Sequence, residues 1–237
     1  GNGIDHALMS LAGMAVGVPT CPMSTAYSTV SQDLGKLAYA LDLLTPRLVF
    51  ASDGRTFGRA LRKVKERGIE IVVSDDTAAE LGATRFSELL DRPISSAVVS
   101  ARSEVGPDTI AKFLFTSGST GSPKAVINTH GMLTANQQQM VLSMPVLAKK
   151  PLVLIDWLPW NHTFGGNYNF NLVLRNGGTV LGAVRHPVAA TDFYGNDVTI
   201  WRPSGSGALA SNPEATMTRS GWYARTAGTT ERSNASM

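Results

Sequence analysis

Residues 110–129 read IAKFLFTSGSTGSPKAVINT, and this stretch decides how the rest of the chain is interpreted. Two strand-like runs flank a loop rich in glycine and hydroxyl residues, which predicts a strand–loop–strand unit. Glycines let backbone N–H groups point inward, and short hydroxyls together with Lys124 can surround a phosphate. The Walker A spacing G-x-x-x-x-G-K-[ST] is absent. A flexible hairpin turn of the same composition is the alternative interpretation.

Helix and strand patterns alternate on both sides of this unit. Apolar residues recur at helical spacing in residues 4–17, 33–44, 58–68, 130–144 and 167–178. Short β-branched runs typical of buried strands occupy residues 18–22, 47–51, 69–74, 151–160 and 179–184. Such alternation predicts an α/β fold with a mostly parallel sheet covered by helices.

Two of the predicted helices have recognisable ends. Gly68 follows a helical pattern and is expected to end it, and Thr129 is placed to cap the helix that begins at residue 130. Residues 75–107 have little periodicity and are expected to form a surface connection.

The character of the sequence changes near residue 183. Residues 183–237 are rich in Ser, Thr, Ala, Gly and Arg and keep no helical or strand period. We therefore expect a domain over residues 1–182 and an irregular tail over residues 183–237. Disorder, a shifted reading frame or an unrelated junction would explain the tail. The chain opens on Gly1, as an internal fragment of a longer protein would, and a processed or trimmed chain is the alternative.

Composition narrows the functional classes. The 237 residues are 43% hydrophobic and 16% charged, an ordinary globular balance, and the net charge is only +3. This small excess gives no reason to expect a nucleic-acid partner, and the apolar run near the start predicts neither a leader nor a membrane span. The single cysteine, Cys21, cannot form an internal disulfide and fits a cytoplasmic location. The sequence leaves the oligomeric state open.

Residues 115–126, FTSGSTGSPKAV, resemble the phosphate-binding signature of the adenylate-forming (AMP-binding) acyl- and aryl-CoA synthetase superfamily, which includes luciferases and peptide-synthetase adenylation domains. The segments THGML, DWLPWNHTFGG and NLVLRNGGTV also resemble consecutive parts of that family. The segment DWLPWNHTFGGNYNF is most similar to the corresponding segment of feruloyl-CoA synthetases, the hydroxycinnamate–CoA ligases. The resemblance covers residues 1–182 and implies part of the family's large N-terminal domain.

The resemblance implies two half-reactions. A carboxylate attacks the α-phosphorus of ATP, bound with Mg²⁺, which gives an acyl-adenylate and pyrophosphate; the thiolate of coenzyme A then displaces AMP. ATP, Mg²⁺, coenzyme A and a small carboxylic acid are the implied cofactors and partners. The implied phosphate-binding residues are Thr116, Ser117, Gly118, Ser119, Thr120, Gly121 and Lys124.

The resemblance places His162 at the acyl pocket near the carboxylate, where it would orient the substrate or gate its access. Trp160 and Phe164, with Trp157 nearby in sequence, would supply an aromatic wall for a phenylpropenoid ring. Judged from residue types alone, a lone histidine and its aromatic neighbours are more often core residues. The other histidines, His6, His130 and His186, lack metal-ligand spacing, so no metal site is expected.

Several family segments have no counterpart that can be identified in this sequence: a further Gly-x-Thr-Glu segment, a ribose-binding aspartate, a hinge, and a mobile C-terminal domain with a catalytic lysine. We therefore expect a fragment of an acid–thiol ligase that binds ATP weakly or not at all and is inactive alone. The alternatives are another acyl- or aryl-CoA synthetase, a non-catalytic nucleotide-phosphate binding module, and an inactive truncated product.

Overall fold

The computed structural model describes residues 2–116 and 123–183, together with the strand segments 198–199, 214–218, 221–226 and 229–232. The chain divides into two compact units. The first comprises Gly1–Thr134 and Pro159–His162, and the second comprises Ala135–Leu158 and Thr163–Met237. Each unit combines helices with strands, so the predicted α/β class is confirmed.

The first unit contains a parallel sheet of three strands. Strands β1 (Leu48–Ala51), β2 (Glu70–Val73) and β3 (Thr84–Arg85) lie in the order β1-β2-β3, and both pairings are parallel. Helix α4 (Gly58–Glu66) connects β1 to β2, as parallel neighbours require a crossover. The helix ends at Glu66, and Gly68 follows the cap residue with a φ of +69°, which glycine adopts without strain and which confirms the predicted helix end.

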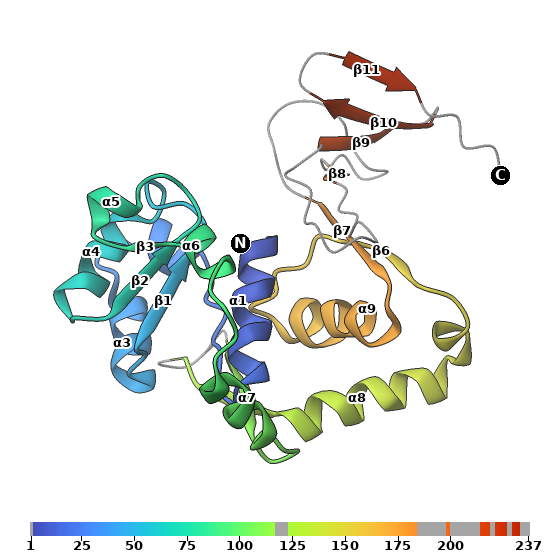
Figure 1. Ribbon diagram of the computed structural model, residues 1–237, viewed down its shortest axis with the longest axis horizontal. Coiled ribbons are helices and arrows are strands. Elements are labelled where there is room, and N and C mark those ends of the chain that lie inside the picture. The colour runs from blue at the N-terminus through green and yellow to red at the C-terminus, as the bar shows by residue number, and fades with distance from the viewer. Residues whose placement is uncertain are drawn as a thin grey trace. The chain divides into compact units, whose positions relative to one another are not determined.

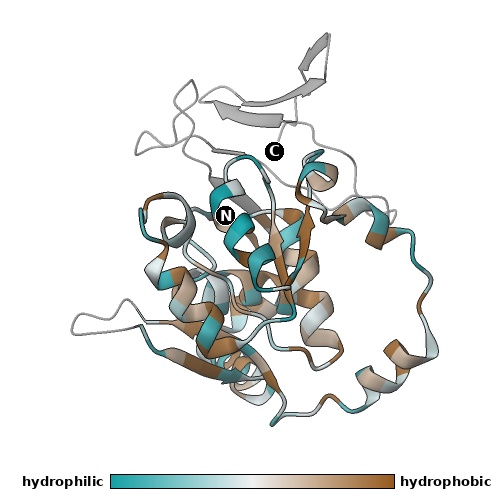
Figure 2. Ribbon diagram, turned by 90° about the vertical axis from the view of Figure 1, so that its left-hand side faces the viewer, coloured by the Kyte–Doolittle hydropathy of each residue, from teal (hydrophilic) through white to brown (hydrophobic). Residues whose placement is uncertain are grey.

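An apolar core lies between this sheet and its helices. Helices α3 (Gly35–Leu44) and α4 lie beside the sheet (Figure 1) and both contribute buried apolar residues, and β2 contributes Val73 at 0% exposure. The buried cluster consists of Leu34, Leu37, Leu41, Ala51, Ala60, Leu61, Val64, Ile71, Val73 and Ala78. In Figure 2 the strands are largely brown, whereas the helices carry both teal and brown residues. Burial of this apolar surface is the main source of stability for the unit.

The predicted strand–loop–strand unit is an antiparallel hairpin. Strand β4 (Ile110–Phe115) pairs with β5 (Ala125–Thr129), with Phe113 opposite Ile127 and a register shift between Ile110 and Lys112. The predicted strand over residues 18–22 is wrong: only Thr20 forms a bridge, parallel to Lys112. Pro19 and Pro22 flank Thr20 and lack the N–H groups that a longer ladder needs.

Short helices make up much of the remaining first unit. Helix α1 (Ile4–Ala15) is the predicted first helix, and α2 (Ala26–Thr29) follows it. The surface connection expected over residues 75–107 instead contains α5 (Ala78–Leu81), β3, α6 (Phe86–Leu90) and α7 (Ser96–Ser103). These elements are too short to show a periodic pattern, and no residue of α7 is buried, so its sequence carries no apolar stripe.

Helix α8 (His130–Ser143) begins directly after β5. The Thr129 Oγ1 atom accepts the backbone N–H of Met132 at 3.2 Å, which confirms the predicted cap. A short 3₁₀ turn, η1 (Pro145–Ala148), follows the helix.

The second unit contains a parallel strand pair joined by a helical segment. Strands β6 (Val153–Asp156) and β7 (Thr179–Ala183) pair in parallel, with Ile155 opposite Leu181. Between them, the π-helical η2 (Phe164–Phe170) continues into α9 (Asn171–Asn176). Gly177, with a φ of +65°, ends α9.

The interior of the second unit is unusually polar. The Asp156 carboxylate is 1% exposed and accepts the Asn169 side-chain amide at 2.7 Å and the Leu158 N–H at 3.1 Å. The Gln137 side-chain amide donates to the Asn167 carbonyl at 2.8 Å. These hydrogen bonds connect β6, α8 and η2 and offset the cost of burying polar groups.

Four short strands lie within the expected irregular tail. β8 (Val198–Thr199) pairs antiparallel with β7, and β9 (Glu214–Thr218), β10 (Gly221–Thr226) and β11 (Thr229–Arg232) form an antiparallel sheet. Threonine and aromatic residues favour strands even without strict alternation. The other residues after Ala183 lie outside the described part of the chain, and the domain boundary at residue 182 stays a prediction.

Candidate functional site

The two ends of the glycine-rich loop are joined by hydrogen bonds. The Thr116 N–H donates to the Lys124 carbonyl at 2.9 Å, and the Lys124 N–H donates to Thr116 Oγ1 at 3.1 Å. These bonds extend the β4–β5 ladder by one step, so the loop leaves and re-enters the hairpin at a fixed position. Thr116 and Lys124 are both exposed, which leaves their side chains available to a ligand.

The central part of the predicted phosphate-binding loop lies outside the described residues. Of the predicted phosphate contacts, the structure describes Thr116 and Lys124, whereas Ser117, Gly118, Ser119, Thr120 and Gly121 fall in the gap at residues 117–122. Their role in phosphate binding stays a prediction.

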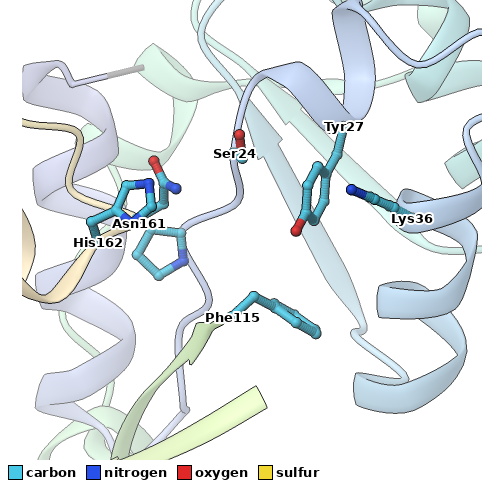
Figure 3. A pocket seen from close by; sticks show the side chains of 7 residues that line it. Ser24, Tyr27, Lys36, Phe115, Asn161 and His162 are labelled. Carbon is cyan, nitrogen blue, oxygen red and sulfur yellow. The ribbon is translucent and has the colours of Figure 1, made fainter. Parts of the chain in front are cut away.

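A cavity of about 200 Å³ lies within the first unit, at the base of this loop. Its lining residues are Pro22, Ser24, Tyr27, Lys36, Phe115, Asn161 and His162. Phe115 is the last residue of β4 and directly precedes Thr116, so the cavity adjoins the start of the loop. Figure 3 shows Asn161 and His162 on one side of the cavity and Tyr27 with Lys36 on the other.

His162 is the predicted catalytic residue that the structure places at this cavity. Its backbone N–H donates to the Pro159 carbonyl at 3.1 Å, which closes a turn over residues 159–162. The imidazole is exposed and can therefore contact a ligand in the cavity. Its assignment to the substrate carboxylate stays a prediction.

The predicted aromatic wall is spread over other contacts. The Trp160 ring packs on His6 with ring centroids 5.7 Å apart, and its backbone N–H donates to Asn2 Oδ1 at 3.0 Å. Phe164 belongs to the second unit, where it stacks on Tyr168 with centroids 4.8 Å apart. Trp160 and Phe164 are not among the residues that line the cavity, and Trp157 is 59% exposed.

Sequence reasoning missed most of the lining. Ser24 and Tyr27 come from the segment between the first two long helices, Lys36 stands in the first turn of α3, and Asn161 directly precedes His162. None of these residues stands in a pattern that predicts chemistry. The fold brings them together because α2 and α3 pack against each other beside the end of β4.

Two titratable groups close to the hairpin, the buried Lys112 and the half-buried Cys21, have shifted pKa values. Burial lowers the pKa of Lys112, which is 4% exposed in the middle of β4, to about 8. Burial also raises the pKa of the Cys21 thiol to about 12. Sγ of Cys21 contacts Sδ of Met23 at 3.6 Å. A thiol with this pKa is a poor nucleophile, so Cys21 is not a candidate for covalent chemistry.

Among the described residues, no group of three or more His, Cys, Asp or Glu side chains could hold a metal ion. His6 and His130 take part in packing and helix initiation, and His186 lies outside the described residues. None of the helices in the described ranges has the length and apolar character that crossing a bilayer requires.

Comparison with known proteins identifies relatives over most of the chain. The chain is 31% identical over 135 residues to 4-coumarate–CoA ligase 1 of Arabidopsis thaliana, an alignment that covers 53% of this chain and 24% of the relative. The chain therefore spans about a quarter of the length of that relative. Among solved structures, it is similar to a luciferase-like enzyme from the mealworm Zophobas morio, with a TM-score of 0.58 and 19% identity over 78% of this chain and 40% of the enzyme.

A second solved structure is a malonyl-CoA ligase described as a ternary product complex with methylmalonyl-CoA and AMP bound. Its TM-score is 0.53 and its identity 22%, over 75% of this chain and 32% of the ligase. At these identities the structural similarities establish the fold, which is that of adenylate-forming ligase domains. Family assignment rests on the sequence: the AMP-binding enzyme family matches residues 1–203, past the expected boundary at residue 182. The chain belongs to the AMP-binding enzyme family.

Proposed function

We propose that this chain is part of an ATP-dependent carboxylic acid–CoA ligase that acts on a hydroxycinnamate such as ferulate. The observation that carries the proposal is the complete FTSGSTGSPKAV signature in a chain of the AMP-binding enzyme family. The joined ends of the loop at Thr116 and Lys124 support it, because a phosphate-binding loop needs a fixed base.

In the first half-reaction, the residues from Thr116 to Lys124 hold the β- and γ-phosphates of Mg·ATP. The Lys124 ammonium, as a compact charge on an exposed side chain, stabilises the charge that grows on the departing pyrophosphate. Mg²⁺ arrives with ATP as part of the substrate.

The acid substrate lies near His162 in this proposal. His162 and Phe115 line one cavity, so a carboxylate beside His162 would be close to the base of the phosphate-binding loop. Closeness of this kind is what an in-line attack on the α-phosphorus needs. Trp160 and Phe164 are proposed to contact the ring of the acid, with Trp157 beside them in sequence.

The second half-reaction transfers the acyl group to coenzyme A. The support is the relationship to 4-coumarate–CoA ligase 1, whose name states a CoA ligase acting on a hydroxycinnamate. The chain spans 24% of that relative, so we propose that the chain alone binds nucleotide weakly and does not turn over. A cytoplasmic location is proposed from the single cysteine.

The acid preference is tested by ligand-observed NMR of the 237-residue chain with ferulate, benzoate and decanoate. The proposal predicts saturation transfer to ferulate, strongest at its ring protons, and reduced transfer in His162→Ala. Thr163→Ala, a neighbouring exposed position outside the cavity lining, is the control. Preferential binding of decanoate would indicate another acyl-CoA synthetase.

Turnover is tested in parallel with ferulate, Mg·ATP and a pyrophosphate-release assay. No release is expected from this chain. Nucleotide binding with no acid binding at all would instead indicate a non-catalytic phosphate-binding module, and release of pyrophosphate would contradict the proposed inactivity of the chain alone.

A further inference from the structure

Every polar side chain that lines the cavity can donate a hydrogen bond. Ser24 and Tyr27 contribute hydroxyls, Asn161 an amide, His162 an imidazole, and Lys36 an ammonium. Among the described residues that line the cavity, none is an Asp or a Glu. A cavity with donors on several sides and no carboxylate suits an anion that presents several oxygen atoms.

Lys36 is held in place by the start of α3. Leu34 has a φ of +54°, a sharp turn that begins the helix at Gly35, and Leu37 and Leu41 on the same helix are buried in the core. The backbone at Lys36 is therefore fixed, while its side chain is exposed at the cavity.

A contact with Tyr27 favours one direction of the Lys36 side chain. The Lys36 Nζ atom lies 5.6 Å from the centroid of the Tyr27 ring, and Figure 3 shows the ammonium pointing at the face of that ring. Tyr27 itself is half-buried and packs against the core cluster, so the ring is a firm support.

The charge of Lys36 is not neutralised by a neighbour. No carboxylate in the described part of the chain forms an ion pair with it, whereas Lys63 on α4 pairs with Glu66 at 3.1 Å. An ammonium that is held at a cavity by an aromatic ring keeps its full charge for a ligand.

We infer that the cavity binds an oxyanion and that Lys36, held by Tyr27, supplies the positive charge that recognises it. The inference deepens the proposed function and rests on it, because that function provides two oxyanions: the carboxylate of the acid and a phosphate of ATP. No sequence motif points to Lys36 or Tyr27, and their assignment comes from the geometry of α2, α3 and the end of β4.

Binding of inorganic pyrophosphate and of ferulate to the 237-residue chain tests the inference, with ³¹P NMR for the first probe and ligand-observed ¹H NMR for the second. Coniferyl alcohol, which keeps the ring of ferulate and lacks its carboxylate, is the control ligand. The variants are Lys36→Met, Lys36→Arg and Tyr27→Leu, with Lys63→Met as the matched lysine control.

We expect Lys36→Met to weaken the binding of one of the two oxyanion probes about tenfold, which corresponds to the loss of one charge-assisted hydrogen bond. Tyr27→Leu should weaken the same probe less, because it releases the ammonium without removing it, and Lys36→Arg should restore most of the binding. Coniferyl alcohol and Lys63→Met should show no change. Since Lys36 is exposed, its replacement should leave the thermal unfolding curve within a few degrees of wild type.

If Lys36→Met weakens the binding of ferulate alone, the cavity binds the carboxylate of the acid. If it weakens the binding of pyrophosphate alone, the cavity binds a phosphate of ATP. Unchanged binding of both probes in Lys36→Met would overturn the inference, as would an equal loss in Lys63→Met or no binding of either probe to the wild-type chain. The inference can fail without the proposed function: if Lys124→Ala abolishes pyrophosphate binding while Lys36→Met changes the binding of neither probe, the phosphate-binding loop stands and the inference does not.

Discussion

The interiors of the two units are built from different chemistry. The first unit buries a continuous apolar cluster between β1, β2, α3 and α4, whereas the second buries Asp156, Gln137, Asn167 and Asn169 around η2. Apolar burial is non-directional, so an apolar interior tolerates small shifts of its side chains. A buried polar group, in contrast, destabilises the protein when it loses its hydrogen-bond partner. The stability of the first unit therefore depends on how well its interior volume is filled, and that of the second on the geometry of its hydrogen bonds.

The largest expected effect is the loss of volume from the first interior. Leu61 is 2% exposed on α4, and Leu61→Ala should lower the free energy of unfolding by about 3 kcal/mol, because it removes buried apolar surface and leaves a cavity. Leu174→Ala on α9 is the control, since Leu174 is 53% exposed and should cost less than about 1 kcal/mol. Urea unfolding followed by circular dichroism measures both, and equal losses would contradict the comparison.

Lys112 is the charged exception within the first interior. Its folded pKa of about 8 lies below the ordinary value of 10.5, so the folded state binds fewer protons between these two values. The cost of burying the charge is therefore fully present below pH 8 and is relieved as the pH rises toward 10.5. The shift corresponds to about 3 kcal/mol as an upper figure.

Lys112→Met should therefore stabilise the chain at pH 7 and remove this rise in stability between pH 8 and 10.5. Urea unfolding at several pH values measures it, with Lys63→Met as a control that keeps the wild-type pH dependence. A variant that is no more stable than wild type at pH 7 would show that Lys112 has a partner that compensates its burial.

Removal of one hydrogen-bonding group probes the geometry of the second interior. Asp156→Ala leaves the Asn169 amide and the Leu158 N–H without the acceptor that they share, and should cost about 2 kcal/mol. Asp156→Asn keeps one oxygen acceptor and should cost less. If both variants unfold at the wild-type urea concentration, the polar interior contributes nothing to stability.

The smallest effect concerns reactivity and not stability. Because the pKa of Cys21 is raised to about 12, very little thiolate is present at pH 8 in the folded chain. Labelling with a thiol-reactive disulfide at pH 8 should be at least about a hundredfold slower in buffer than in urea at the same pH. Comparable rates in the two solvents would place Cys21 in an open, solvated environment.

Elements with a long apolar period were predictable from the sequence. The helices α1, α3 and α4, the parallel strands β1 and β2, and the cap at Thr129 follow directly from spacing and residue type. The helices between residues 75 and 107 were not predictable, since four to eight residues are too few to display a period.

The candidate site was predictable only in part. The loop signature pointed to Thr116 and Lys124, and the family resemblance pointed to His162. Tyr27 and Lys36 were not predicted because their contact is tertiary: the two residues stand on different helices, and neither has a spacing that indicates chemistry. A similar limit applies to Trp160, whose packing on His6 joins residues far apart in the sequence.

The most direct test of the central claim is a ³¹P NMR titration of magnesium pyrophosphate with the wild-type chain and with Lys124→Ala. If the loop from Thr116 to Lys124 holds the phosphates of ATP, the wild-type chain should broaden or shift the pyrophosphate signal, and Lys124→Ala should weaken binding about tenfold. Lys149→Ala, another exposed lysine, should bind as wild type does. Equal binding by wild type and Lys124→Ala, or no binding by either, would contradict the assignment of this loop to phosphate.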